Sequence, residues 1–139
     1  MPWLVAVAMI IVAVAMAPEA ADDAAKIAGR YAVVGVNPNK TTYTGVVEVT
    51  RESANTVLVR WTIGTGQTVG IGIVRGDVLA VSYIGGIDGG PAPAAGLYTC
   101  KKKRCDGVWT IGGVHDRVFT ETLTRDENAQ PTAQPVQPR

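Results

Sequence analysis

Turn-forming residues recur at short intervals along most of this chain, and this spacing constrains the fold more than any other feature. The sequence has 16 glycines and 8 prolines. From Gly29 onward, turn residues separate runs of β-branched and aromatic residues about every 8 to 14 positions. Gaps this short allow only antiparallel neighbours, because a parallel crossover needs about a dozen residues or more. The chain is therefore predicted to be all-β.

The predicted strands share a period-two pattern, in which apolar side chains occupy every second position. In the third strand, Val57, Val59 and Trp61 lie on one face. Strands are expected over residues 29–36, 42–51, 57–63, 68–74, 78–84, 95–100, 105–111 and 117–124, with a Gly/Pro/Ala loop over 85–94. A meander of this kind buries its edges best by closing on itself. We therefore predict an antiparallel up-and-down β-barrel of about eight strands over residues 29–125.

The N-terminal segment carries an uncharged apolar run from Trp3 to Met16, followed by small residues. A membrane span needs roughly 20 apolar residues, so this shorter run is typical of the core of a signal peptide. No Lys or Arg precedes the run, which departs from the usual pattern, and a retained anchor is the alternative. We predict a signal peptide over residues 1–17, export to the periplasm or outside the cell, and no stable membrane span after processing.

Two segments flank the predicted barrel. Residues 18–28 are rich in Ala and Asp and are expected to form a linker. Residues 126–139 are polar and rich in Pro and Gln, so they have little apolar surface to bury and are expected to be disordered.

The only two cysteines, Cys100 and Cys105, are separated by four residues. An exported protein encounters an oxidising environment, so we predict a disulfide that clamps a hairpin. The competing interpretation is a metal site, which would need more ligands, and His115 is the only other soft candidate. We therefore expect no metal and no cofactor.

The segment between the cysteines is a run of four cations, Lys101, Lys102, Lys103 and Arg104. At a hairpin tip, such a cluster is suited to an anionic surface or an extracellular macromolecule. The alternative is an ordinary solvated turn. The formal net charge of the whole chain is only +1, which argues against nucleic acid as a partner.

The aromatic side chains of the predicted barrel fall one to a strand, except in the Gly-rich fourth. They are Tyr31, Tyr43, Trp61, Tyr83, Tyr98, Trp109 and Phe119. A small barrel is either filled by its own side chains or holds one small ligand. Periodicity leaves both interpretations open, and the aromatic set is the candidate lining for a small apolar ligand.

Glu121 is the one acidic residue expected to face into the barrel, because it shares a face with Phe119 and Leu123. A buried carboxylate is costly unless it is hydrogen-bonded or hydrated. One interpretation makes Glu121 a ligand contact. The other pairs it with a Tyr hydroxyl, a Trp N–H or an Arg of the barrel itself.

Residues that carry catalysis are not marked out by any pattern. The chain has one His, and it shows neither a Ser/His/Asp arrangement nor a glycine-rich phosphate loop followed by a helix. The chain is therefore predicted not to be an enzyme. The preferred function is an exported binding module, and the alternative is a structural or envelope-associated protein that acts through the surface of a solid barrel.

Several spaced motifs resemble a group of small exported bacterial β-barrel proteins, often uncharacterised or labelled fibronectin-binding-like. The matching patterns are Gly-x-Tyr-x-Val-x-Gly-x-Asn-Pro over 29–38, Tyr-x-Gly-x-Val over 43–47, Trp-x-Ile-Gly over 61–64, Asp-Gly-x-Trp-Thr over 106–110 and Glu-x-Leu over 121–123. The resemblance implies a barrel and export, and says little about activity. The cysteine pair and its basic tip depart from the pattern. A more distant likeness in topology is to the lipocalin and avidin barrels.

Overall fold

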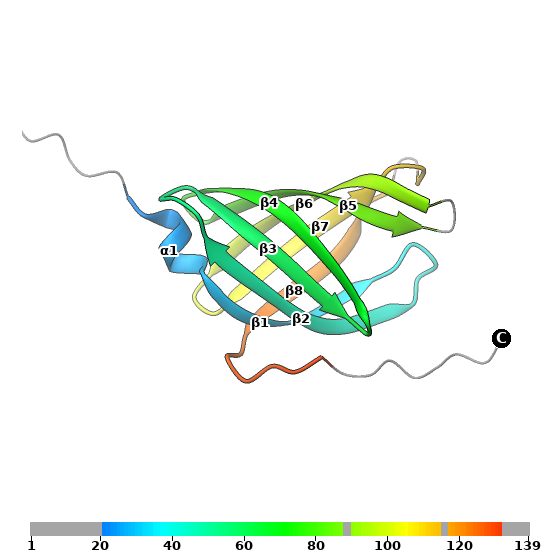
Figure 1. Ribbon diagram of the computed structural model, residues 1–139, viewed down its shortest axis with the longest axis horizontal. Helices are drawn as coiled ribbons and strands as arrows, with labels where there is room; N and C mark the ends of the chain where they lie inside the picture. The colour runs from blue at the N-terminus through cyan, green and yellow to red at the C-terminus, as the bar shows by residue number, and fades with distance from the viewer. Residues whose placement is uncertain (1–20, 88–89, 115–116, 132–139) are drawn as a thin grey trace, which may run out of the picture.

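A computed structural model describes residues 21–87, 90–114 and 117–131 of the chain, which form one closed β-barrel (Figure 1). Its strands are β1 (Gly29–Val36), β2 (Thr42–Arg51), β3 (Thr56–Ile63), β4 (Gly66–Arg75), β5 (Val78–Ile87), β6 (Gly90–Lys101), β7 (Arg104–Ile111) and β8 (Phe119–Arg125). Each strand pairs antiparallel with the next, and β8 pairs with β1 to complete the circle. The predicted antiparallel up-and-down barrel is confirmed.

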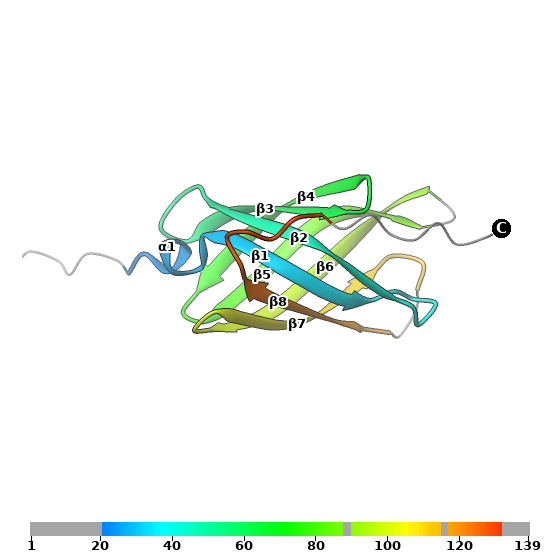
Figure 2. The same cartoon turned by 90° about the horizontal axis from the view of Figure 1, so that it is seen from below.

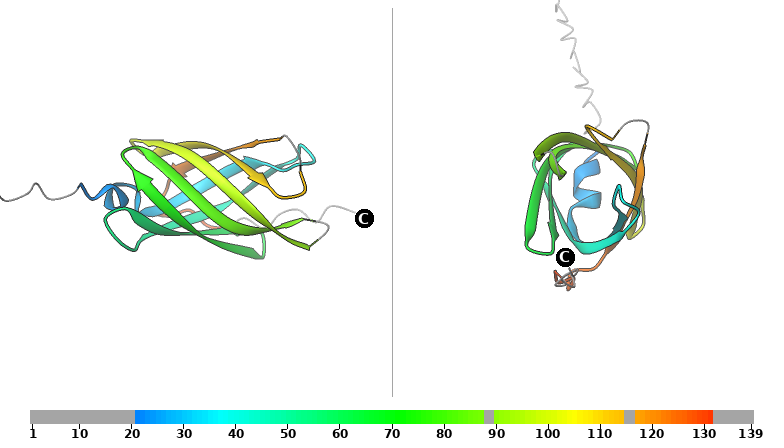
Figure 3. Two further views of the ribbon diagram at one scale, coloured as in Figure 1. Left: turned by 90° about the horizontal axis from the view of Figure 1, so that it is seen from above. Right: turned by 90° about the vertical axis from the view of Figure 1, so that its right-hand side faces the viewer.

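A short helix, α1 (Asp23–Ile27), closes one end of the barrel, so the prediction of a linker over 18–28 is wrong for these residues. Asp22 caps the helix by accepting a hydrogen bond from the Ala25 N–H, at 3.0 Å. Ala24 and Ile27 belong to the barrel's buried core. Apolar burial against the barrel end thus orders a segment whose composition alone is that of a linker. Looking down the barrel axis, Figure 3 shows α1 at the far end of the lumen.

The first part of the predicted tail is also ordered, contrary to expectation. The Asp126 N–H donates to the carbonyl of Arg30, at 2.9 Å, and Arg30 Nε donates to the carbonyl of Ala129, at 2.8 Å. Ala129 is buried, and Figure 2 shows the segment crossing the outer face of β1 and β2. Hydrogen bonds to an outward-facing arginine therefore hold a polar segment in place. The predicted signal peptide and residues 132–139 lie outside the described part of the chain.

The loop predicted over residues 85–94 is instead the end of a long β5–β6 hairpin. Ile84 pairs with Pro93, and Gly86 pairs with Pro91. Proline removes a backbone donor, but β7 pairs with β6 only as far as Ala94, so no neighbour on that side requires one. The part of this hairpin over residues 84–87 and 90–93, which we call the hairpin arm, therefore extends beyond the barrel wall and reaches past the open end (Figure 3).

No helix in the described part of the chain is long and apolar enough to cross a membrane.

The half of the barrel next to α1 is filled by its own side chains. The largest fully buried side chains of the described residues are Tyr31, Tyr98, Leu79, Leu123, Val33, Val47, Val57, Val59 and Val74. The Tyr31 hydroxyl donates to the carbonyl of Ile27, at 2.7 Å, and so ties α1 to the core. This end of the barrel is therefore solid.

Cys100 and Cys105 are direct partners across the β6–β7 ladder, and a disulfide joins them. The predicted disulfide clamp is thus present. The basic tip lies beyond it, at the same end of the barrel as α1. Arg125 connects the two, because its backbone N–H donates to the Lys103 carbonyl, at 2.7 Å, and its Nη2 donates to the Lys26 carbonyl of α1, at 3.0 Å.

Replacing both cysteines by serine is expected to lower the free energy of unfolding by about 2 kcal/mol, because the unfolded chain regains the entropy of a short closed loop. Urea unfolding of the variant and of the wild type measures the difference. A reducing agent should produce a similar loss in the wild type and no further loss in the variant. Equal unfolding midpoints for the oxidised wild type and the variant would show that the clamp adds no stability.

Candidate functional site

Glu121 lies inside the barrel on β8, only 5% exposed, and accepts hydrogen bonds from three aromatic side chains. Trp61 Nε1 donates to Oε1 at 2.9 Å, and the Tyr98 hydroxyl donates to the same oxygen at 2.8 Å. The Tyr43 hydroxyl donates to Oε2. Of the two interpretations of Glu121, the structure therefore contains the one in which the carboxylate pairs with Tyr hydroxyls and a Trp N–H of the barrel itself.

Two glycines make this arrangement possible. Gly35 on β1 and Gly107 on β7 are the register partners of Glu121 on its two sides. Tyr43 lies opposite Gly35, and Tyr98 lies opposite Gly107. A Cβ atom at Gly35 would come within 2.1 Å of the Tyr43 ring, and one at Gly107 within 2.2 Å of the Tyr98 ring. Each tyrosine therefore lies across a glycine, and its hydroxyl reaches the carboxylate on the neighbouring strand.

The carboxylate affects the tyrosines around it. Burial raises the pKa of Tyr43, Tyr83 and Tyr98 well above the usual tyrosine value, and the negative charge of Glu121 raises each further. Removing a proton from any of them would place a second negative charge beside the first. These side chains are accordingly neutral hydrogen-bond donors in the folded protein.

A pocket of about 190 Å³ lies at the end of the barrel opposite α1, and we call it the mouth pocket. It is lined by Asn37, Pro38, Tyr43, Trp61, Ile63, Thr68, Tyr83, Gly85, Gly86, Trp109, Ile111 and Glu121. The barrel is thus solid at one end and hollow at the other. The sequence left two alternatives, a barrel filled by its own side chains and a barrel with room for a small ligand. The structure combines them, because the half next to α1 is filled and the other half contains a pocket lined by aromatic side chains.

Five of the eight predicted ligand-binding residues line the mouth pocket: Tyr43, Trp61, Tyr83, Trp109 and Glu121. The other three do not. Tyr31 lies in the solid half, Tyr98 is covered and reaches Glu121 from within the core, and Phe119 packs against Trp109 with ring centroids 5.0 Å apart. Alternation along a strand places a side chain inside or outside the barrel, but it does not set its depth along the barrel axis.

The remaining lining residues were not among the predicted ligand-binding residues. Asn37 and Pro38 belong to the β1–β2 turn, Gly85 and Gly86 to the hairpin arm, and Thr68 lies opposite Trp61 on β4. A Cβ at Gly85 would come within 2.7 Å of Cδ1 of Ile111, so Gly85 leaves room for the end of that lining side chain. The signal that would have identified these residues is cross-strand register, which local sequence patterns do not contain.

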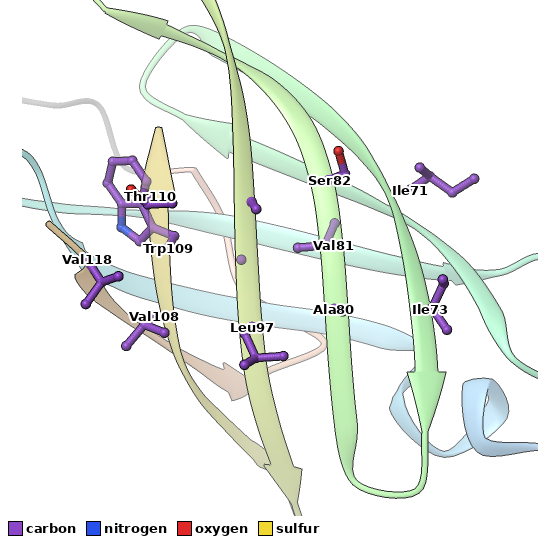
Figure 4. A pocket seen from close by; sticks show the side chains of 12 residues that line it. Ile71, Ile73, Ala80, Val81, Ser82, Leu97, Val108, Trp109, Thr110 and Val118 are labelled. Carbon is purple, nitrogen blue, oxygen red and sulfur yellow. The ribbon is translucent and has the colours of Figure 1, made fainter. Parts of the chain in front are cut away.

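A second concave region lies on the outer wall, over β4 to β7 (Figure 4). It measures about 550 Å³, and small residues such as Ala80, Ser82 and Ala95 form its floor. Exposed Ile71 and Ile73 border it on one side, and Val108 and Val118 on the other. Its described lining has no charged side chain to orient a ligand, whereas the mouth pocket combines apolar walls with a carboxylate. We therefore place the candidate site in the mouth pocket.

The predicted anionic-partner patch, Lys101 to Arg104, is exposed at the far end from this pocket. Arg104 Nη2 lies 2.8 Å from Asp106 Oδ1, so one of the four cations is already paired. Among the described residues there is no group of three His, Cys, Asp or Glu side chains that would hold a metal ion.

Comparison with known proteins identifies the fold but no family. No protein-family model matches the chain, and no curated protein matches it, so the resemblance to fibronectin-binding-like proteins stays a prediction. Among solved structures, a redesigned β-barrel is 22% identical, with a TM-score of 0.60 over 78% of this chain and 98% of its own. Another redesigned barrel, mFAP1 bound to DFHBI, is 21% identical, with a TM-score of 0.60 over 76% of this chain and 100% of its own. A fluorescence-activating barrel designed de novo is 15% identical, with a TM-score of 0.59 over 76% of this chain and 98% of its own.

Proposed function

We propose that this chain is an exported, non-catalytic binding protein that holds a small, largely apolar molecule in the mouth pocket. The observation that carries the proposal is the pocket itself. Four aromatic rings and two aliphatic side chains surround a hydrogen-bonded carboxylate at the open end of an otherwise solid barrel. Concave, mostly apolar sites with a few placed polar groups are typical of small-ligand pockets.

Three further observations support the proposal. The fold is shared with designed barrels, one of which is bound to the small molecule DFHBI. Among the described residues that line the mouth pocket, none besides Glu121 is acidic or basic, so Glu121 has no partner there with which to exchange a proton. A disulfide between the only two cysteines is suited to the oxidising compartment that export would provide.

Filling the mouth pocket should weaken binding strongly. Thr68 is half-buried at the mouth, opposite Trp61, so Thr68→Trp would place a large ring in the pocket. Its neighbour Gln67 is exposed on the outer face, and Gln67→Trp adds the same bulk outside. Benzyl alcohol serves as the neutral probe, and nuclear magnetic resonance follows the indole N–H signals of Trp61 and Trp109.

We expect saturable shifts in the wild type and in Gln67→Trp, and at least tenfold weaker binding in Thr68→Trp. Native mass spectrometry of gently purified protein should also reveal a bound small molecule. An empty wild-type barrel that shows no saturable binding of the probe would rule out the pocket as a ligand site.

A further inference from the structure

Among the residues that the structure describes, the carboxylate at the base of the mouth pocket has no positive partner. Its three hydrogen-bond donors are neutral, and none of the ion pairs in the described part of the chain involves Glu121. The described lining of the pocket contains no Lys, Arg or His. Neutral donors offset part of the cost of burying a charge, but an uncompensated negative potential remains. The raised pKa values of the surrounding tyrosines have this charge as their second cause, after burial.

The walls around this charge are aromatic. Trp61 and Tyr83 lie together with ring centroids 4.9 Å apart and a 37° tilt. Tyr43 and Trp109 meet edge to face, with centroids 6.4 Å apart. The face of an aromatic ring is negative and attracts a cation, most strongly where water is excluded. The aromatic walls and the carboxylate therefore both favour a positively charged ligand.

A metal ion would not satisfy this site. Calcium and magnesium take about six or more oxygen ligands, and transition metals need several nitrogen, sulfur or oxygen donors. The mouth pocket offers the carboxylate of Glu121 and otherwise mostly carbon. A cation whose charge is covered by alkyl groups would contact those carbon faces and still lie beside the carboxylate.

We propose that the mouth pocket binds a small organic cation of the alkylammonium class, with the charged group among Tyr43, Trp61, Tyr83 and Trp109 and beside the Glu121 carboxylate. This inference rests on the proposed function and specifies the charge of the ligand. A neutral molecule would gain the apolar contacts alone, and an anion would be repelled.

The test compares two probes of nearly equal shape on the wild-type protein. Choline carries a quaternary ammonium group and a hydroxyl, and dimethylbutanol is its uncharged analogue, with carbon in place of the ammonium nitrogen. Nuclear magnetic resonance of the Trp61 and Trp109 indole signals reports both titrations. We expect choline to bind at least tenfold more tightly. Equal affinity for the two probes would overturn the cation inference and leave the proposed function intact, whereas no binding of either probe or of benzyl alcohol would remove both.

Two variants separate the charge from the rings. Glu121→Gln keeps an acceptor oxygen for the tyrosines and removes the charge, so choline affinity should fall at least tenfold while dimethylbutanol affinity stays within about twofold. Tyr83→Leu replaces one aromatic side chain of the pocket wall by an aliphatic one. We again expect choline affinity to fall at least tenfold while dimethylbutanol affinity stays within about twofold. Val34→Leu, on the exposed outer face of β1, is the matched control and should bind both probes as the wild type does. An unchanged preference for choline in both site variants would contradict the inference. Because the comparison of probes uses the wild type, it decides the question even where a variant folds poorly.

Discussion

Glu121→Leu is expected to lower the free energy of unfolding by about 3 kcal/mol or more, because each buried donor left unpaired costs about 1 to 3 kcal/mol. The substitution leaves three donors without their acceptor: the Tyr43 and Tyr98 hydroxyls and the Trp61 N–H. Water in the mouth pocket can reach Tyr43 and Trp61, which line it. Tyr98 is only 1% exposed and is expected to account for most of the loss.

Denaturant unfolding of the variant measures this effect. Thr120→Leu adds a similar side chain at the preceding position, on the exposed outer face of β8, and should change stability by no more than about 0.5 kcal/mol. If Glu121→Leu were as stable as the wild type, the three donors would have to find other partners, and the carboxylate would be free of a structural role.

High pH is expected to unfold the barrel steeply, because all four tyrosines of the chain have raised pKa values. Burial is the main cause for Tyr31, Tyr43, Tyr83 and Tyr98, and the charge of Glu121 adds to it for the last three. In the unfolded chain a tyrosine releases its proton near pH 10, at about its reference pKa. The folded state holds that proton to higher pH, so stability is complete below about pH 10 and falls as the pH rises further.

The magnitude follows from the number of protons involved. Each tyrosine that stays protonated only in the folded state contributes about 1.4 kcal/mol per pH unit, and four together contribute up to about 5 kcal/mol per pH unit. Ultraviolet absorbance of tyrosinate measures ionisation, and circular dichroism measures unfolding in the same sample. The two signals should rise together above about pH 10, while protein unfolded in urea titrates near pH 10. Tyrosinate absorbance in a barrel that remains folded at pH 10 would contradict this expectation.

Features set by local pattern were predictable from the sequence. The turn residues placed the eight strands and their order, and alternation placed Trp61, Tyr83 and Glu121 inside the barrel. The cysteine spacing predicted their pairing across one hairpin. Each of these conclusions depends on residues only a few positions apart, where backbone geometry alone decides which side chains meet.

Elements held by contacts between distant residues were not predictable in the same way. Helix α1 is short and would not form by propensity alone; it is held by Asp23 Oδ2, which accepts from the Gly76 N–H at 2.9 Å, and by Arg51, whose Nη2 lies 2.8 Å from Asp22 Oδ2. The tail segment is held by Arg30. Their composition indicated a linker and a disordered tail, because each segment has few apolar residues of its own. Composition gives no information about the barrel surface on which each segment packs.

The antiparallel barrel and the side chains that face its interior follow from the amino-acid sequence, because turns and the two-residue period of a strand specify both. The depth of each interior side chain along the barrel axis depends on the folded structure. The bond from Tyr43 to Glu121 spans 78 positions in the chain, and the bond from Trp61 to Glu121 spans 60. Such pairs meet only once the register of every intervening strand is set and the barrel is closed. The hollow end and its uncompensated carboxylate are therefore properties of the register.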